Sequence, residues 1–183
     1  ICKIPHGSYN VAAISDYCVS VAQSLNLEVR QDEEYNVVIR KPASEGYGEA
    51  PVLMLQGHLD MVCVKDAGVD FDFEKDGLNL VIEDGYVHAK GTTLGGDDGI
   101  AVAMGLAILE DNTIEHPELE VVLTTEEEVG MEGAIALGTA NLKAKYLLNL
   151  DSEDEGHFLA GCAGGVKATS FLPMSCASAE GTA

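Results

Sequence analysis

PVLMLQGHLD, residues 51–60, is an apolar run that leads directly into a histidine and an aspartate. Residues 51–56 present apolar side chains to both faces, which is typical of a strand buried inside an open sheet. Two later runs have the same character, VVLT at 121–124 and YLLNL at 146–150, and helical patterns separate the three. Strands that alternate with helices in this way predict an α/β fold with a mostly parallel central sheet.

The sequence before this stretch predicts one helix and one strand. Apolar residues recur at helical spacing from Val11 to Leu25, and Ser8 or Asn10 is a suitable N-cap. A strand is expected at residues 36–40, followed by a loop rich in Pro, Gly and Glu.

The sequence after it predicts a hairpin, two helices and a last strand. Residues 80–88 contain an Asp-Gly pair, which suits the tight turn of a hairpin. A helix is expected at residues 99–110, where apolar side chains on nearly all sides predict burial. A second helix is expected at residues 133–142 and a strand at residues 166–172.

Composition excludes several classes of partner. The 183 residues suffice for one packed domain, and 10 Lys and Arg stand against 31 Asp and Glu, for a net charge of −21. Such a surface repels phosphate and anionic lipid, so we expect no nucleic acid and no membrane partner. Five cysteines form no Cys-x-x-Cys pair, and their odd number indicates free thiols in a reducing compartment, the cytoplasm.

Each of the three apolar runs is followed at once by side chains that can bind a metal. GHLD at 57–60 follows the first, TEEEVG at 125–130 the second and DSE at 151–153 the third. GGDDG at 95–99 adds a fourth group just before a helix. In open α/β sheets, ligands bind beyond the carboxyl ends of the strands, so we expect these groups to meet at one rim.

The chemistry of these side chains favours a divalent cation. Closely packed carboxylates ionise together only when a cation balances them, and histidine with carboxylates suits Zn²⁺ or a similar first-row metal. His58 and Asp60 share a face of an extended chain, so Asp60 can hold one ring nitrogen while the other binds metal. Glu127 and Glu128 diverge, so one can bind metal while the other handles protons.

Each acidic stretch also has an ordinary structural interpretation. A run of glutamates is typical of a solvated loop, and Asp97 and Asp98 before a helix can serve as an N-cap. Asp151 after a strand can simply begin a turn. The occurrence of all four stretches at strand or helix ends favours the metal site.

The chain resembles the two-zinc exopeptidase family, which contains dipeptidases, tripeptidases, aminoacylases and carboxypeptidases. The wider family shares the His-x-Asp, Asp and Glu-Glu signals, found here at 58–60, 97 and 127–128. The branch of Xaa-His dipeptidases shares further stretches, namely CKIPHGSYN at 2–10, TTLG at 92–95 and GCAGG at 161–165. The resemblance implies a three-layer α/β catalytic domain, of which residues 1–183 form an N-terminal part.

The resemblance also implies a cofactor and its ligands. Two Zn²⁺ per complete protomer are expected, with Mn²⁺ or Co²⁺ as alternatives. His58 and Asp151 correspond to ligands of one metal and Glu128 to a ligand of the other. Asp97 corresponds to the bridge between the two metals.

The family's reaction is the hydrolysis of a peptide bond by water held between two metals. In that reaction Glu127 corresponds to the general base, and Asp60 to the carboxylate that orients the histidine ligand. The family often has a cis peptide bond after the bridging aspartate, here Asp97–Asp98. Unblocked dipeptides are the implied substrates, especially Xaa-His dipeptides such as β-alanyl-histidine.

One part of the family pattern is missing from this sequence. The family supplies another metal-binding histidine near its C-terminal end, and a lid domain that also forms a homodimer. Neither is present by Ala183, and the chain starts at Ile1 without Met, so we expect a fragment that binds metal weakly and hydrolyses little. The alternatives are an N-acyl amino acid deacylase or carboxypeptidase of the same family, or a non-catalytic cation-binding module.

Overall fold

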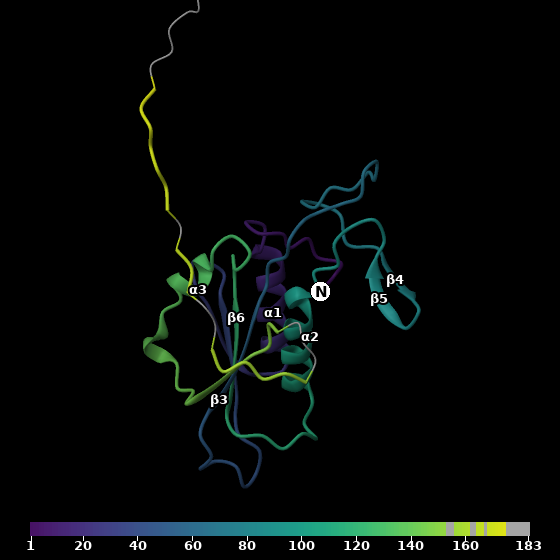
Figure 1. Cartoon of the computed structure of the whole chain (residues 1–183). Coiled ribbons are helices and arrows are strands. Elements are labelled where there is room, and N and C mark those ends of the chain that lie inside the picture. Colours follow the sequence, from purple (N-terminus) through teal and green to yellow (C-terminus); the bar gives the residue numbers. More distant parts are fainter. Residues whose placement is uncertain (153–155, 162–163, 167, 175–183) are drawn as a thin grey trace, which may run out of the picture. The chain divides into compact units, whose positions relative to one another are not determined.

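A computed structural model describes residues 1–152, 156–161, 164–166 and 168–174. The chain divides into two compact units, Ile1–Glu153 and Asp154–Ala183. All assigned helices and strands belong to the first unit (Figure 1). The described residues of the second unit carry neither, so the strand expected at 166–172 is wrong at each described position, residue 167 lying outside them. Apolar composition alone does not make a strand, because its backbone groups need a hydrogen-bonding neighbour.

A five-stranded sheet with the order β1-β2-β6-β3-β7 forms the centre of the first unit. Its strands are β1 (Glu28–Gln31), β2 (Val37–Lys41), β3 (Leu53–His58), β6 (Leu119–Thr124) and β7 (Tyr146–Asn149). β3 pairs in parallel with both β6 and β7, whereas β2 runs antiparallel to β1 and β6. All strands except β2 therefore point the same way, which confirms the mostly parallel sheet.

The parallel direction brings three strand ends together. β3, β6 and β7 all end at the same edge, and the three metal-capable stretches follow at that edge. The structure extends β3 to His58, so this histidine is the last residue of the strand rather than part of the following loop.

Two layers of helix cover the sheet. Figure 1 shows α1 (Ala12–Ser24) and α2 (Gly96–Glu110) on one side and α3 (Glu132–Ala136) on the other. Alternate strand residues face each layer, since neighbouring side chains of a strand point to opposite faces. The larger core, on the α1 and α2 side, includes Val37, Ile39, Leu55, Val121 and Leu123. The smaller core contains Val38, Met54 and Val122.

The N-terminus of α1 differs from the prediction. The helix is capped by Val11 with no side-chain hydrogen bond, so neither Ser8 nor Asn10 is its N-cap. The Ser8 hydroxyl donates instead to Asp60, 2.8 Å away. The partner of the Ser8 hydroxyl is therefore a carboxylate far along the chain rather than a backbone amide at the start of α1.

α2 carries the aspartate pair at its start and is anchored at its end. The helix begins at Gly96, three residues earlier than expected, and Asp97 and Asp98 have non-helical backbone angles within its first turn. The buried Lys41 ammonium donates to the carbonyl oxygens of Ile108, at 2.9 Å, and Asp111. A cation at a helix C-terminus satisfies carbonyls that lack a partner and complements the helix dipole.

The burial expected for α2 and β7 is only partly correct. Ile100 and Met104 on α2 are 57% and 48% exposed, and β7 is exposed throughout. α2 packs against β3 and α1 with one face, and β7 is an edge strand that pairs only with β3 among the described strands. An apolar sequence thus predicted more burial than these elements have.

The hairpin lies where it was predicted, and the second predicted helix is only partly helical. β4 (Leu80–Glu83) and β5 (Tyr86–Ala89) form the expected hairpin around Asp84 and Gly85, both of which have positive φ. The helix expected at 133–142 is divided into α3 and the 3₁₀ helix η1 (Thr139–Asn141). No helix within the described residues is both long and apolar enough to cross a bilayer.

Candidate metal centre

His58 lies at the centre of the acidic groups. Its side chain is 1% exposed, and its Nε2 lies 3.0 Å from Asp97 Oδ1 at the start of α2. Its Nδ1 lies 2.9 Å from the Asp60 carbonyl oxygen and 3.4 Å from Asp60 Oδ1. As predicted, Asp60 contacts one ring nitrogen of His58, and it does so with its main-chain carbonyl oxygen as well as with its carboxylate. The other ring nitrogen faces Asp97.

The Asp60 carboxylate ties together three segments of the chain. It accepts hydrogen bonds from the Ser8 hydroxyl at 2.8 Å and from the backbone amides of Glu127 and Glu128 at 3.0 and 3.3 Å. Burial opposes ionisation of this group, but the hydrogen bonds from His58, Glu127 and Ser8 outweigh it and lower the pKa of Asp60. A carboxylate with both oxygens engaged in this way is suited to orienting its neighbours.

Two groups of potential ligand atoms converge on His58. Among the described residues, His58 groups with Asp97 and Glu128, and separately with Asp98 and Asp151, with all atoms of each group within 4.8 Å of one another. The structure thus brings all four of the predicted ligands around His58, from β3, the start of α2, the loop after β6 and the segment after β7.

Asp98 is the member of these groups that the sequence did not single out as a ligand. It is buried, and its Oδ2 accepts the backbone N–H of His58 at 3.2 Å. The peptide bond between Asp97 and Asp98 is cis, which confirms that expectation. The pair of aspartates is evident in the sequence, but only the fold shows that the Asp98 carboxyl lies against Gly57 and His58 of β3.

The pKa values reflect crowding of negative charge. Burial and the charge of Asp151 raise the pKa of Asp98 to about 7, even though His58 lowers it. Burial opposes protonation of the His58 ring, but hydrogen bonds to Asp60 and Asp97 outweigh it and raise the pKa of His58 to about 10. In the absence of a metal, a proton on His58 therefore takes the place of a cation.

The two glutamates after β6 show the same effect. Burial raises the pKa of Glu127, and Asp151 raises it further against the opposing charge of His58. Burial and the charge of Asp97 raise the pKa of Glu128. Each carboxyl therefore responds to the charges of the other acids, and a divalent ion among them would relieve this repulsion. One imidazole nitrogen with several carboxylate oxygens is a donor set that fits Zn²⁺.

Part of the predicted pattern lies outside the described residues. Glu153 of the DSE stretch, and residues 162–163 of the GCAGG stretch, are among these.

Comparison with known proteins gives one family match. Residues 54–166 match the model of peptidase family M20/M25/M40. The matched range holds His58, Asp97, Glu127, Glu128 and Asp151.

The chain is also similar to one curated relative over nearly its whole length. It is 45% identical over 174 residues to the cytosol non-specific dipeptidase of Escherichia coli strain K12. The match covers 95% of this chain and 36% of the relative, so the chain spans about a third of that protein's length.

Two solved structures share the fold with substantial identity. The aminoacylhistidine dipeptidase of Vibrio alginolyticus superposes with a TM-score of 0.82 and 44% identity, covering 85% of this chain and 32% of that one. A tripeptidase from Staphylococcus aureus superposes with a TM-score of 0.68 and 25% identity, covering 84% of this chain and 41% of that one.

Proposed function

Because this chain belongs to peptidase family M20/M25/M40, we propose that it takes part in the metal-dependent hydrolysis of the peptide bond of unblocked dipeptides. The similar proteins from Escherichia coli and Vibrio alginolyticus are both dipeptidases by name, which supports this choice within the family. The observation that carries the proposal is the position of His58, whose ring nitrogens lie within 4.8 Å of carboxylate oxygens from three other segments.

The proposed metal ligands are His58, Asp97, Glu128 and Asp151. They would hold two Zn²⁺, with Mn²⁺ or Co²⁺ as alternatives, and Asp97 would serve both ions. Asp97 Oδ1 lies 3.0 Å from His58 Nε2, and both belong to the group that contains Glu128, which supports a shared position for Asp97. Glu128 and Asp151 belong to different groups around His58, which supports their assignment to different ions.

In this proposal Glu127 moves the protons of the reaction. Bound divalent ions lower the pKa of water and polarise a substrate carbonyl. Glu127 accepts a proton from the attacking water and delivers it to the leaving amine. Its raised pKa brings the carboxyl closer to the neutral range in which one group can do both. Its backbone amide bonds to Asp60 at 3.0 Å, so the same carboxylate orients both His58 and the base.

The proposal extends to the substrate and the setting. The relatives' names support a dipeptide substrate and a cytosolic protein, whereas the lid domain and the homodimer are expectations from the family resemblance. We take Xaa-His dipeptides such as β-alanyl-histidine as the preferred class, with a free amino group. We place the chain in the N-terminal part of the catalytic domain of a cytoplasmic protein that forms a homodimer through a separate lid domain. A deacylase of the same family would use the same ligands and differ in requiring an N-acyl group.

Metal removal and two substitutions test the proposal in the native protein. Chelation should abolish hydrolysis of β-alanyl-histidine, and added Zn²⁺, Mn²⁺ or Co²⁺ should restore it. Glu127→Ala should retain bound metal and lose turnover, whereas Glu128→Ala should lose metal as well. Activity on N-acyl amino acids in place of free dipeptides would favour the deacylase. If neither substitution changes hydrolysis, the assigned roles are wrong.

A further inference from the structure

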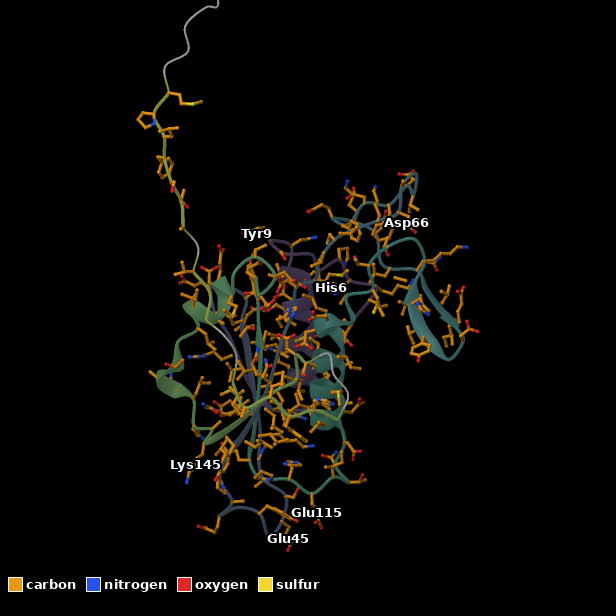
Figure 2. All side chains as sticks on the ribbon, in the orientation of Figure 1. His6, Tyr9, Glu45, Asp66, Glu115 and Lys145 are labelled. Carbon is orange, nitrogen blue, oxygen red and sulfur yellow. The ribbon has the colours of Figure 1, made fainter. Side chains whose placement is uncertain are left out.

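We propose that residues 6–9, here called the N-terminal clasp, hold the Glu127–Glu128 loop in a fixed position beside His58. Ser8 and Glu126 are the positioning residues. This inference rests on the proposed function, because it concerns how the proposed base and ligand are placed. Figure 1 shows the N-terminal segment, in purple, passing beside the loop that follows β6, and Figure 2 labels Tyr9 at that position.

The clasp is fixed to the segment that directly follows β3, the strand that carries His58. The Met61 amide donates to the His6 carbonyl oxygen at 3.1 Å, and Gly7 forms a parallel bridge with Met61. A Cβ on Gly7 would overlap the Cys63 sulfur, so the glycine at position 7 lets the backbone of the clasp lie against Cys63. His6 is 4% exposed, and its ring Nδ1 lies 2.6 Å from the Ile4 carbonyl oxygen. These contacts give the clasp a defined position beside the C-terminal end of β3.

Ser8 makes the first of two links from the clasp to the loop. Its hydroxyl donates to Asp60 Oδ2 at 2.8 Å, and Asp60 is 1% exposed. The same carboxylate accepts the amides of Glu127 and Glu128. These three donors carry no charge, and they hold the carboxylate in place beside the His58 ring, whose Nδ1 lies 3.4 Å from Asp60 Oδ1. Removing the hydroxyl leaves Oδ2 with a weaker set of donors and frees the carboxylate to rotate away from the two amides.

Glu126 makes the second link, from the loop back to the clasp. Its Oε2 accepts the Tyr9 backbone N–H at 2.7 Å. Glu126 is 7% exposed, whereas the Asp97 side chain in the same site is 56% exposed. Tyr9 and Glu126 both have positive φ, at 66° and 56°. Side chains other than glycine rarely adopt this conformation, and surrounding contacts must hold it. The bond between them joins the two strained positions directly.

The two links have one geometric consequence. Glu126 is bonded to the clasp, and the next two residues are bonded to Asp60, which is itself bonded to the clasp. The Glu127 and Glu128 side chains therefore extend from a backbone that is held by the clasp and by Asp60. Residues 127–130 form a turn in which the Gly130 and Met131 amides donate to the Glu127 carbonyl oxygen at 3.0 and 3.1 Å. If the clasp had a purely structural role, its loss would destabilise the whole fold. If it has a positioning role, its loss affects the Glu127 and Glu128 amides and the carboxyls of these two residues.

Ser8→Ala in the native protein tests the first link, with Ser8→Thr as the conservative variant. Ser20→Ala is the matched control, because the Ser20 hydroxyl is exposed on α1 and donates to the Tyr17 carbonyl oxygen. In the metal-free protein, Ser8→Ala should make the Glu127 and Glu128 amides exchange hydrogen about tenfold faster, with the α1 amides unchanged. It should weaken Zn²⁺ binding by about tenfold and lower kcat by about tenfold, with KM nearly unchanged. Ser8→Thr should restore all three.

Glu126→Leu tests the second link and should speed exchange of the Tyr9 amide, while Glu126→Gln keeps an acceptor oxygen and should not. Unchanged exchange at residues 127–128 and unchanged Zn²⁺ affinity in Ser8→Ala would overturn the proposal. Faster exchange at every amide would also overturn it, because that result shows a global loss of stability. If the wild-type protein hydrolyses no dipeptide, the proposed function fails, but hydrogen exchange and Zn²⁺ affinity still decide whether the clasp positions the loop.

Discussion

Gly57→Ala perturbs the contact between β3 and the start of α2, on which the position of His58 depends. A Cβ at residue 57 would lie 2.5 Å from the Ala101 Cβ and 2.6 Å from Asp98 Oδ2. Carbon atoms pack at about 3.5 Å, so the strand and the helix must separate by about 1 Å. Both neighbours are short side chains on a packed helix, and neither can swing away as the end of a long side chain could.

The expected cost combines two effects. Overpacking a close contact of this kind costs about 1–3 kcal/mol. The shift also strains the hydrogen bond from the His58 amide to Asp98 Oδ2, now 3.2 Å, and a weakened bond to a buried carboxylate costs about 1–3 kcal/mol. Because the two effects share one displacement they do not simply add, and we expect a loss of about 2–4 kcal/mol in the free energy of unfolding.

Denaturant unfolding and Zn²⁺ titration of the native protein measure the two consequences. Zn²⁺ affinity should fall by about 10–100-fold, since His58 and Asp97 lie on the elements that move apart. Gly138→Ala is the control: a Cβ there meets nothing within 4 Å and φ is −72°, so its stability should stay within about 0.5 kcal/mol of wild type. If Gly57→Ala matches this control in unfolding and in metal affinity, the packing argument is refuted.

Two further predictions follow from His58 and Lys41. The raised pKa of His58, about 10 against 6.5, stabilises the metal-free fold fully below pH 6.5 and less as pH rises through 10. Metal must displace that proton, so Zn²⁺ affinity measured by chelator competition should rise about tenfold per pH unit from 7 to 9; a flat profile contradicts the protonated ring. Lys41→Met removes the ammonium from the Ile108 and Asp111 carbonyls and should lower stability by about 1–3 kcal/mol in denaturant unfolding, unlike the exposed Lys90→Met. Equal unfolding midpoints for these two lysine variants would show that Lys41 does not anchor α2.

The sequence was sufficient for the elements whose patterns are local. The apolar runs of β3 and β6, the Asp-Gly turn of the hairpin and the helical spacing of α1 all depend on neighbours along the chain. The direction of the strands could also be predicted, since α/β alternation leads to parallel strands with their carboxyl ends at one edge. That edge is where His58, Asp97, Glu128 and Asp151 meet, although their roles remain predictions.

The predictions that were wrong depended on contacts between distant residues. Ser8 matched an N-cap pattern, but an acceptor 52 residues away holds its hydroxyl. The exposed faces of β7 and α2 could not be read from their apolar sequence, because composition does not state which neighbours an element has. α2 starts at Gly96 because the fold accommodates non-helical angles at Asp97 and Asp98 within its first turn.

The sequence by itself determined which side chains are available for chemistry and at which edge of the sheet they emerge. Strand periodicity is a property of a short stretch of chain, and the order of strands and helices sets the direction of the strands. Only the tertiary structure decided how they are held: the Asp98 carboxyl turned under Gly57, and the Asp60 carboxylate shared by Ser8 and two loop amides. Hydrogen bonds across 40 to 68 residues have no local pattern, since they form only after the intervening chain has packed.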